Sequence, residues 1–475
     1  MKSETYDVVI IGAGTAGLSA RREVAKVTDN YLLIDDGPLG TTCARVGCMP
    51  SKVLIEVANL YARRKIMSSV GIEGGEQLAL SGKQVMNHVR SLRDRFVRGV
   101  RQSMEGWEKT HLLRERAHFG EAGDIIAGNK RIKAGAVIIA TGSKPVLPEK
   151  WKVFKPWLLD SDSFFELEEL PKKMAVIGLG VIGAELGQAL ARLGVEVTAI
   201  GDASSVGGVT DPQMKEYVGR YFAGEFGLLE GRAEELVQQG DRLLVKSSGG
   251  SVEVDRALLT MGRRPVLQDL GLEKLGIELK SDGTPEADEG TGLISGSNSI
   301  YLAGDATRNR MILHEAADEG RIAGYNAVRE SAHCFRKRVR LTITFTAPNV
   351  AIAGESFREL TARGADFVTG LASFEGQGRA IVKLAEKGMI RVYIERSSGA
   401  ILGSEIFAPE GEHLAHLLAW CIEGGTSVFR ALSFPFYHPV LEEGLRTALR
   451  HGATQVQKKA PDLEALRCQD PPAGS

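Results

Sequence analysis

Several features are scarce in this sequence of 475 residues. It has no block of like charge, and its 59 basic and 60 acidic residues nearly cancel, so no basic stripe for nucleic acid is indicated. No apolar run approaches the ~18 residues of a membrane span. The apolar stretch near the N-terminus follows Glu4 and Asp7 rather than basic residues, so it does not resemble a secretory signal. We expect a soluble cytoplasmic protein with neither nucleic-acid nor membrane partners.

Cysteine is also rare, and it is unevenly placed. Of the five cysteines, only Cys43 and Cys48 lie close together, whereas Cys334, Cys421 and Cys468 stand alone. An odd number in a chain of this length does not indicate a disulfide framework. A zinc site would need a second cysteine pair or a histidine in register, which the sequence lacks. No metal site is predicted, and the close pair needs another explanation.

Glycine, by contrast, is abundant at 56 residues, and it forms two similar units. The strand-like segment YDVVII precedes GAGTAG, and the later segment KMAVI precedes GLGVIG. Each unit continues with a helical pattern and a second strand, which is the order of a dinucleotide-binding unit. Such glycines let backbone amides and a helix N-terminus approach a pyrophosphate. Two bound dinucleotides are predicted, at Gly12, Gly14 and Gly17 and at Gly178, Gly180 and Gly183.

The residue that ends the second strand differs between the two units. In the first unit it is Asp35, at the place where a carboxylate accepts hydrogen bonds from ribose hydroxyls. In the later unit it is Gly201, followed by Asp202. An NADP site would favour a nearby arginine, and residues 202–218 contain none. NAD is therefore favoured at the second unit, with NADP as the alternative.

The spacing of Cys43 and Cys48 restricts their backbone. Residues five apart point about 140° apart on a regular helix, and a disulfide needs Cα atoms within roughly 7 Å. The pair must therefore lie on irregular backbone, for which Gly40 and Gly47 supply the freedom. Pro50 favours the first turn of a helix, which places Cys48 at a helix N-terminus, where the pKa of a thiol is lowered. A redox-active pair is predicted, with two idle cysteines as the alternative.

Together these motifs resemble the pyridine-nucleotide:disulfide oxidoreductase family over about residues 6–450, and most of all its dihydrolipoamide dehydrogenase members. The resemblance rests on GAGTAG, C-x₄-C-x-P-S-K, ATGSKP, GLGVIGAE, GRRP, YLAGDA and HPVLEE. It implies that the first unit binds FAD, with Thr141, Gly142 and Asp305 completing that site. It also implies that the second unit, together with Gly262 and Asp202, binds a nicotinamide dinucleotide.

The implied fold class is α/β, with two Rossmann-like dinucleotide-binding domains and an α+β C-terminal dimerisation domain. The nicotinamide domain would be inserted into the FAD domain. The expected boundaries are 1–150 for the first part of the FAD domain, 151–270 for the NAD(P) domain, 271–340 for the second part of the FAD or central domain, 341–460 for the dimerisation domain and 461–475 for a flexible tail.

The resemblance also implies roles for individual side chains. Cys48 would face the flavin, and Cys43 would exchange with the substrate. Lys52, one helical turn after Cys48, would lie near the flavin and pair with Glu185. Electrons would then pass between a substrate dithiol, the Cys43–Cys48 disulfide, FAD and NAD.

In the family, the histidine of the C-terminal His-Pro motif and its carboxylate come from the partner subunit. His438 and Glu443 match that motif, so the resemblance implies a homodimer whose active site is shared between chains. A thiol reacts as a thiolate, and an imidazole oriented by a carboxylate is a suitable base for it.

Some residues depart from the family pattern. Arg45 adds a cation where the family usually has Asn, Phe436 and Tyr437 are bulky, and Val440 and Glu442 replace Thr and Ser. The substrate is therefore left open, as a small-molecule or lipoyl-type dithiol or disulfide. The alternatives are an NADPH-dependent disulfide reductase resembling glutathione reductase and a non-catalytic flavoprotein redox sensor.

Overall fold

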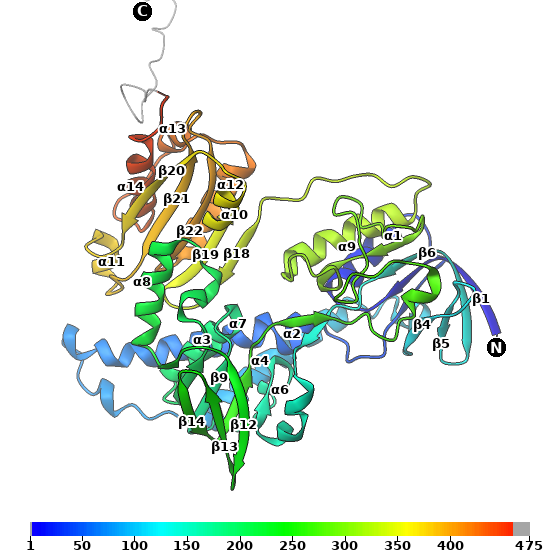
Figure 1. Cartoon of the computed structure of the whole chain (residues 1–475), viewed down its shortest axis with the longest axis horizontal. Coiled ribbons are helices and arrows are strands. Elements are labelled where there is room, and N and C mark those ends of the chain that lie inside the picture. The colour runs from blue at the N-terminus through cyan, green and yellow to red at the C-terminus, as the bar shows by residue number, and fades with distance from the viewer. Residues whose placement is uncertain (1, 459–475) are drawn as a thin grey trace, which may run out of the picture.

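Strand β1 (Lys2–Ile11) lies inside the first sheet of the computed structural model, which describes residues 2–458. It pairs in parallel with β2 (Tyr31–Ile34) and β6 (Lys130–Ile139), and its VVII run is buried on both faces, as is typical of parallel sheets. Strand β17 (Ile300–Leu302) pairs with β6. The first lobe is thus built from two separate stretches of the chain (Figure 1).

Helices cover this sheet, and short strands extend it. Helix α1 (Thr15–Val24) follows the first glycine turn and packs against α9 (Leu313–Ala327), which comes from the later stretch. The strand order is β3-β2-β1-β6-β5-β4. The remaining strands are β3 (Leu112–Leu113), β4 (Ala117–Phe119) and β5 (Ile125–Ala127).

The second glycine unit forms a second parallel sheet, in the order β11-β10-β9-β15-β8. Helix α7 (Val181–Arg192) follows its glycine turn, and a three-stranded antiparallel sheet in the order β12-β13-β14 lies beside it. The strands are β8 (Leu158–Leu159), β9 (Lys173–Ile177), β10 (Glu196–Ile200), β11 (Gly227–Leu229), β12 (Ala233–Gln239), β13 (Arg242–Ser247), β14 (Gly250–Val254) and β15 (Arg256–Leu259).

The chain crosses between these two lobes twice, and the two crossings run side by side. Strand β7 (Ser143–Pro145) leaves the first lobe and pairs antiparallel with β16 (Arg263–Pro265), which returns to it. Arg263 holds the crossings together, because its guanidinium donates to the hydroxyl and the carbonyl of Ser143, each at 2.8 Å. A further bond reaches the Ser161 hydroxyl at 2.9 Å.

The third lobe is an antiparallel sheet in the order β18-β19-β22-β21-β20, covered by helices α12 (Gly411–Glu423) and α14 (Glu442–Ala453) (Figure 1). Its strands are β18 (Leu341–Thr344), β19 (Asn349–Gly354), β20 (Phe367–Ser373), β21 (Met389–Glu395) and β22 (Ile401–Ala408). The fold class predicted from the sequence is therefore confirmed. The residue boundaries of the domains stay a prediction, and the predicted flexible tail, 461–475, lies outside the described residues.

Two long helices connect the lobes. Helix α3 (Cys48–Ala62) and helix α4 (Gly82–Gln102) pack against each other, and α3 packs against α7 of the second lobe. One apolar cluster joins Leu54, Met86 and Leu186 to Phe407 of the third lobe. The remaining helices are α2 (Thr42–Val46), α5 (Glu108–His111), α6 (Ser161–Phe164), α8 (Pro212–Ala223), α10 (Phe357–Ala362), α11 (Gly378–Val382) and α13 (Val428–Leu432).

Within residues 2–458, no helix is both long and apolar enough to cross a bilayer. The same part of the chain contains no group of three or more His, Cys, Asp or Glu side chains placed to hold a metal ion.

Candidate active site

The two close cysteines lie on two consecutive helices. Cys43 is in the short helix α2, and Cys48 is the first residue of α3. The break between them is at Gly47, whose backbone has φ −127° and ψ −118°. A β-carbon there would stand 3.1 Å from the Thr42 carbonyl oxygen and 3.3 Å from Cys43 Cα. The expected irregular backbone is thus a single tight glycine turn.

Both cysteines are thiols in this structure, and their ionisation is coupled. The Cys43 thiol donates a hydrogen bond to Cys48, and this bond, together with the nearby Lys52 ammonium, lowers the pKa of Cys48 to about 7. The same hydrogen bond, together with burial, raises the pKa of Cys43. Near neutral pH the Cys48 thiol of the reduced pair is therefore partly ionised, while Cys43 remains a thiol. Lys52, rather than Arg45, is the cation identified beside both sulfurs.

The coupling predicts a shift in the reactivity of Cys48. Replacing Cys43 with alanine removes the donor that lowers the pKa of Cys48, so that pKa should rise by about one unit or more. The measurement is the rate of alkylation by iodoacetamide against pH, followed on the peptide that contains Cys48. Cys43→Ser keeps a hydroxyl donor and should shift the midpoint less. A midpoint that stays near 7 in Cys43→Ala would contradict the assignment.

Lys52 and Glu185 form an ion pair between different lobes. Lys52 Nζ lies 3.0 Å and 2.8 Å from the two carboxylate oxygens of Glu185. Glu185, on α7, is only 4% exposed and also accepts from the Phe345 amide at 2.8 Å. Lys52 Nζ stands 4.7 Å from the centre of the Phe345 ring. The pair expected from the sequence is therefore present, and Phe345 is a contact that no pattern in the sequence indicated.

Removing the cation from this pair should cost stability. In Lys52→Met the Glu185 carboxylate stays buried without its counter-ion, and we expect the free energy of unfolding to fall by about 2 kcal/mol. This is below the ~3–5 kcal/mol of fully buried pairs, because Lys52 is one-third exposed. The measurement is guanidinium unfolding. Adding Glu185→Gln to Lys52→Met should recover part of the loss; a larger loss in the double variant would contradict this account.

The two glycine turns share one geometry. Gly12 and Gly178 have φ of +109° and +103°, which a side chain would strain. A β-carbon at Gly17 would stand 1.8 Å from the Gly12 carbonyl oxygen, and one at Gly183 would stand 1.9 Å from that of Gly178. These four positions therefore require glycine, since any side chain would separate the helix from the turn.

The middle glycines serve a different purpose. A β-carbon at Gly14 or at Gly180 would meet no atom within 4 Å. Both are the N-cap residues of their helices, α1 and α7, and neither helix has a side-chain cap. The first backbone N–H groups of each helix therefore face open space, which is the arrangement that receives a pyrophosphate.

Residues around the first turn fit a bound FAD. The Thr141 hydroxyl is buried without a hydrogen-bond partner, so a polar group is missing from its surroundings. A β-carbon at neighbouring Gly142 would meet no atom within 4 Å. Asp35 follows β2 and accepts from the amides of Ala13 at 2.7 Å and Gly37 at 2.8 Å. The carboxylate expected to bind ribose is thus held against the glycine turn.

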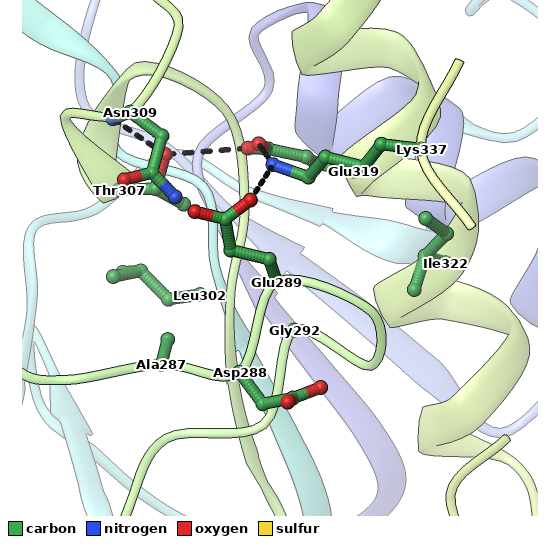
Figure 2. Close-up of a pocket in the computed structure, with 10 residues that line it drawn as sticks. All are labelled: Ala287, Asp288, Glu289, Gly292, Leu302, Thr307, Asn309, Glu319, Ile322 and Lys337. Atoms are coloured by element: carbon green, nitrogen blue, oxygen red, sulfur yellow. Dashed lines mark hydrogen bonds and ion pairs between the residues drawn. The ribbon is translucent and has the colours of Figure 1, made fainter. Parts of the chain in front are cut away.

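The backbone next to Asp305 is bound by a buried carboxylate. It lies in the 3-10 helix Gly304–Thr307 and accepts from the Ser143 hydroxyl at 2.6 Å. Gly304 donates its amide to Glu319 at 2.9 Å, and burial raises the pKa of Glu319. Lys337 contacts Glu319 at 2.8 Å and Glu289 at 3.5 Å, and Figure 2 shows its ammonium between them. No pattern in the sequence indicated these contacts.

The second unit departs from the first beyond its turn. Gly201 directly follows β10 and carries no carboxylate, while Asp202 is exposed. Gly262 precedes β16 and has φ +98°, with no atom within 4 Å of a built β-carbon. The turn geometry of this unit fits a second dinucleotide, but the ribose position differs from that of the first unit.

His438 and Glu443 lie in the third lobe, at the start of α14. His438 Nδ1 stands 3.0 Å and 3.1 Å from the two carboxylate oxygens of Glu443. This contact lowers the pKa of Glu443, and a hydrogen bond from the Val440 amide at 3.2 Å lowers it to a smaller extent. The imidazole is 80% exposed, and within residues 2–458 no hydrogen bond joins it to either cysteine. One chain therefore keeps the base and the thiols separate.

An apolar groove adjoins His438, between α12 and α14. Tyr437 is 79% exposed and Trp420 is 68% exposed. Arg446 stacks 5.7 Å from the centre of the Phe436 ring. The bulky residues noted before His438 thus belong to a larger surface, which the sequence did not reveal. Its lining includes Leu417, Trp420, Phe434, Phe436 and Tyr437.

Two open glycine turns and a coupled thiol pair beside an ion pair define a class of protein. Such a chain binds two dinucleotides and exchanges electrons with a disulfide. Comparison with family models gives the family itself. A model described as pyridine nucleotide-disulphide oxidoreductase matches residues 6–320, and the model of its dimerisation domain matches residues 341–449. The chain belongs to the pyridine nucleotide-disulphide oxidoreductase family, and the second match supports a homodimer.

Individual relatives agree with this placement. The chain is 31% identical over 460 residues to dihydrolipoyl dehydrogenase of Bacillus subtilis, which covers 93% of this chain and 97% of that protein. It is 30% identical over 468 residues to mitochondrial dihydrolipoyl dehydrogenase of Rattus norvegicus, covering 93% and 89%. These similarities support an FAD-dependent disulfide oxidoreductase that uses a pyridine nucleotide.

Solved structures share the fold. The flavoprotein disulfide reductase RclA of Escherichia coli, in a Cu(II) complex, has a TM-score of 0.81 at 20% identity, covering 92% of this chain and 98% of that one. LpdA of Mycobacterium tuberculosis has a TM-score of 0.78 at 24% identity, covering 94% and 99%.

Proposed function

We propose that the chain is an NAD-dependent dehydrogenase of dihydrolipoyl-type dithiols, acting as a homodimer in the cytoplasm. The observation that carries the proposal is the coupled pair, with the pKa of Cys48 at about 7 and that of Cys43 raised. This difference gives the two sulfurs separate tasks. The dihydrolipoyl dehydrogenases among the relatives support the substrate class.

The proposed exchange begins with the oxidised pair. A substrate thiolate attacks the Cys43 sulfur, the Cys43–Cys48 bond breaks, and Cys48 leaves as a thiolate. Its pKa near 7 and the nearby Lys52 ammonium stabilise that leaving group. The second substrate thiol gives its proton to His438 of the partner subunit and attacks the mixed disulfide. The substrate departs as a disulfide, and Cys43 leaves as a thiolate that takes up the proton held by His438.

FAD fits the first unit, where the α1 turn would receive its pyrophosphate, and Thr141 and Asp305 would hold it. Bound there, it would supply an acceptor for the electron pair of the reduced cysteines and a donor of hydride to a nicotinamide. The Lys52–Glu185 pair keeps a fixed positive charge beside Cys48. The Glu443 carboxylate, 3.0 Å from His438 Nδ1, orients the imidazole.

The proposal is tested by assaying dihydrolipoamide, lipoamide and glutathione disulfide side by side with both nicotinamides. We expect the highest kcat/KM for dihydrolipoamide with NAD. A kcat/KM about tenfold or more higher with NADP(H) would overturn the NAD assignment. Preference for glutathione disulfide with NADPH would favour the glutathione reductase-like alternative, which Gly201 keeps open because it provides no carboxylate for the ribose of NAD.

A non-catalytic flavoprotein sensor is the remaining alternative. Anaerobic addition of NADH distinguishes it from the enzyme, with free thiols counted before and after. We expect the flavin to be reduced and two thiols to appear, at Cys43 and Cys48. Reduction of the flavin without new thiols, and without turnover of any tested disulfide, would favour the sensor.

A further inference from the structure

Helix α4 carries an excess of positive charge that the overall balance of the chain conceals. Its residues include six basic side chains and one acidic side chain. Arg95, Arg98 and Arg101 follow one another at intervals of three residues, and all three are exposed. Spaced in this way they form no contiguous block in the sequence, which is why the sequence indicated no basic stripe.

Other arginines of the same helix have structural partners. Arg93 contacts Asp94 at 2.9 Å and Glu166 at 2.5 Å, and Arg90 donates to the Leu167 carbonyl. Within residues 2–458, by contrast, the side chains of Arg95, Arg98 and Arg101 have no hydrogen bond, ion pair or ring contact. Three guanidinium groups therefore stand in solvent without a role in holding the fold.

The row of like charges also lowers the stability of the helix that carries it. Like charges three residues apart destabilise a helix by roughly 0.2–0.5 kcal/mol per pair. The helix dipole favours a cation only in the last turn, where Arg101 lies. Arg95 and Arg98 gain little from that dipole. The row is therefore explained better by something that binds it than by the stability of α4.

The row is close to the segment that carries Cys43. Helix α4 packs against α2, and a β-carbon placed on Gly40 would stand 2.8 Å from Val97 Cγ1 and 3.4 Å from Arg45 Cγ. The stem of Arg45, two residues after Cys43, thus borders α4 beside Val97. Its Nε is buried without a hydrogen-bond partner. Within residues 2–458, Arg45 is therefore a further arginine whose side chain has no hydrogen-bond partner, two residues from Cys43.

We propose that Arg95, Arg98 and Arg101 form a docking surface for an acidic protein domain that carries the dithiol or disulfide to Cys43. The proposal rests on the proposed function, because it takes Cys43 as the exchanging thiol. The row spans about 9 Å along α4, which suits a protein face better than a small anion. Three cations are also few for nucleic acid, whose binders neutralise roughly six to ten phosphates.

The test compares one dithiol on two carriers. Free dihydrolipoamide is neutral, whereas a dihydrolipoyl group on a lipoyl domain of net negative charge presents an acidic surface. In the triple variant Arg95→Glu, Arg98→Glu, Arg101→Glu, we expect kcat/KM for the domain to fall about tenfold or more, since steering by charge changes association rates by roughly 10–10³. The kcat/KM for free dihydrolipoamide should be unchanged. Added salt should weaken wild-type activity on the domain more than that of the variant.

A charge-matched control carries the same change elsewhere. Lys133, Lys155 and Arg232 are exposed and unpaired within residues 2–458, so their triple replacement by Glu should leave activity on the domain near the wild-type value. Equal losses in both triple variants would overturn the proposal and leave only a general charge effect. An unchanged kcat/KM for the domain in the α4 variant would overturn it as well.

Binding measured without turnover separates this proposal from the proposed function. Anisotropy of a fluorescently labelled acidic lipoyl domain reports docking even if no dithiol is oxidised. Loss of binding only in the α4 variant, with no turnover of dihydrolipoamide by the wild type, would support the surface and refute the substrate class. Tighter binding of duplex DNA than of the domain at the same row would overturn the choice of partner.

Discussion

Replacing Cys43 with serine is expected to abolish dithiol turnover while the flavin is still reduced by NADH. The hydroxyl of serine cannot form the mixed disulfide that exchange requires, so kcat for dihydrolipoamide oxidation should fall by about a thousandfold or more. Cys48 keeps its place at the start of α3 and its contact with the Lys52 charge. Oxidation of the dithiol and reduction of the flavin by NADH can therefore be measured separately in this one variant.

The measurement for Cys43→Ser pairs steady-state dithiol oxidation with rapid-mixing reduction by NADH. Cys421→Ser is the matched control, because Cys421 is a half-buried free cysteine on α12 outside the pair. It should retain wild-type rates in both assays. Full dithiol activity in Cys43→Ser would refute the role proposed for Cys43 and, with it, the direction of exchange within the pair.

Replacing His438 with glutamine should lower dithiol oxidation by about 10²–10⁴, the usual contribution of a general base. Glutamine preserves the size of the side chain but accepts no proton. Glu443→Gln should give a smaller loss, since it leaves the imidazole in place without the carboxylate that stands 3.0 Å away. Reduction of the flavin by NADH should stay at the wild-type rate in both variants, because the role proposed for both residues is to deprotonate the dithiol and not to transfer hydride.

Mixed dimers test whether the site is shared. In a dimer of one Cys43→Ser chain and one His438→Gln chain, a shared arrangement leaves one of the two sites with both residues intact. Activity should therefore reappear when the two inactive variants are unfolded together and refolded. The control pairs His438→Gln with the double variant Cys43→Ser, His438→Gln, which leaves no intact site. Absence of recovery in the first mixture would place thiol and base in one chain.

The local parts of this architecture could be predicted from the sequence. Gly17 and Gly183 are fixed by the carbonyl oxygens of Gly12 and Gly178, five residues earlier, and such contacts follow from spacing. The place of Cys48 at a helix start followed from Pro50 in the same way. Structure that depends on neighbouring residues can be predicted from short motifs. For this reason the sequence predicted both glycine units and the cysteine turn.

Contacts between distant segments were harder to predict. Lys52 and Glu185 are 133 residues apart, and only the resemblance to the family paired them. Nothing in the pattern indicated that the Phe345 amide donates to Glu185, or that Lys337 balances Glu319 behind Asp305. Each of these contacts depends on how the lobes pack, which the periodicity of a single segment does not determine.

The pairing of β7 with β16 has a consequence for how such a chain can be assembled. Arg263 pairs with Pro145 in the register of that ladder, so the intervening segment leaves and rejoins the first lobe at neighbouring points. A segment with adjacent ends can be inserted, removed or exchanged without reopening the parent fold. The nicotinamide unit is therefore a module in the evolutionary sense. Its coenzyme preference can diverge by changes after β10, while the flavin lobe and the cysteine turn stay the same.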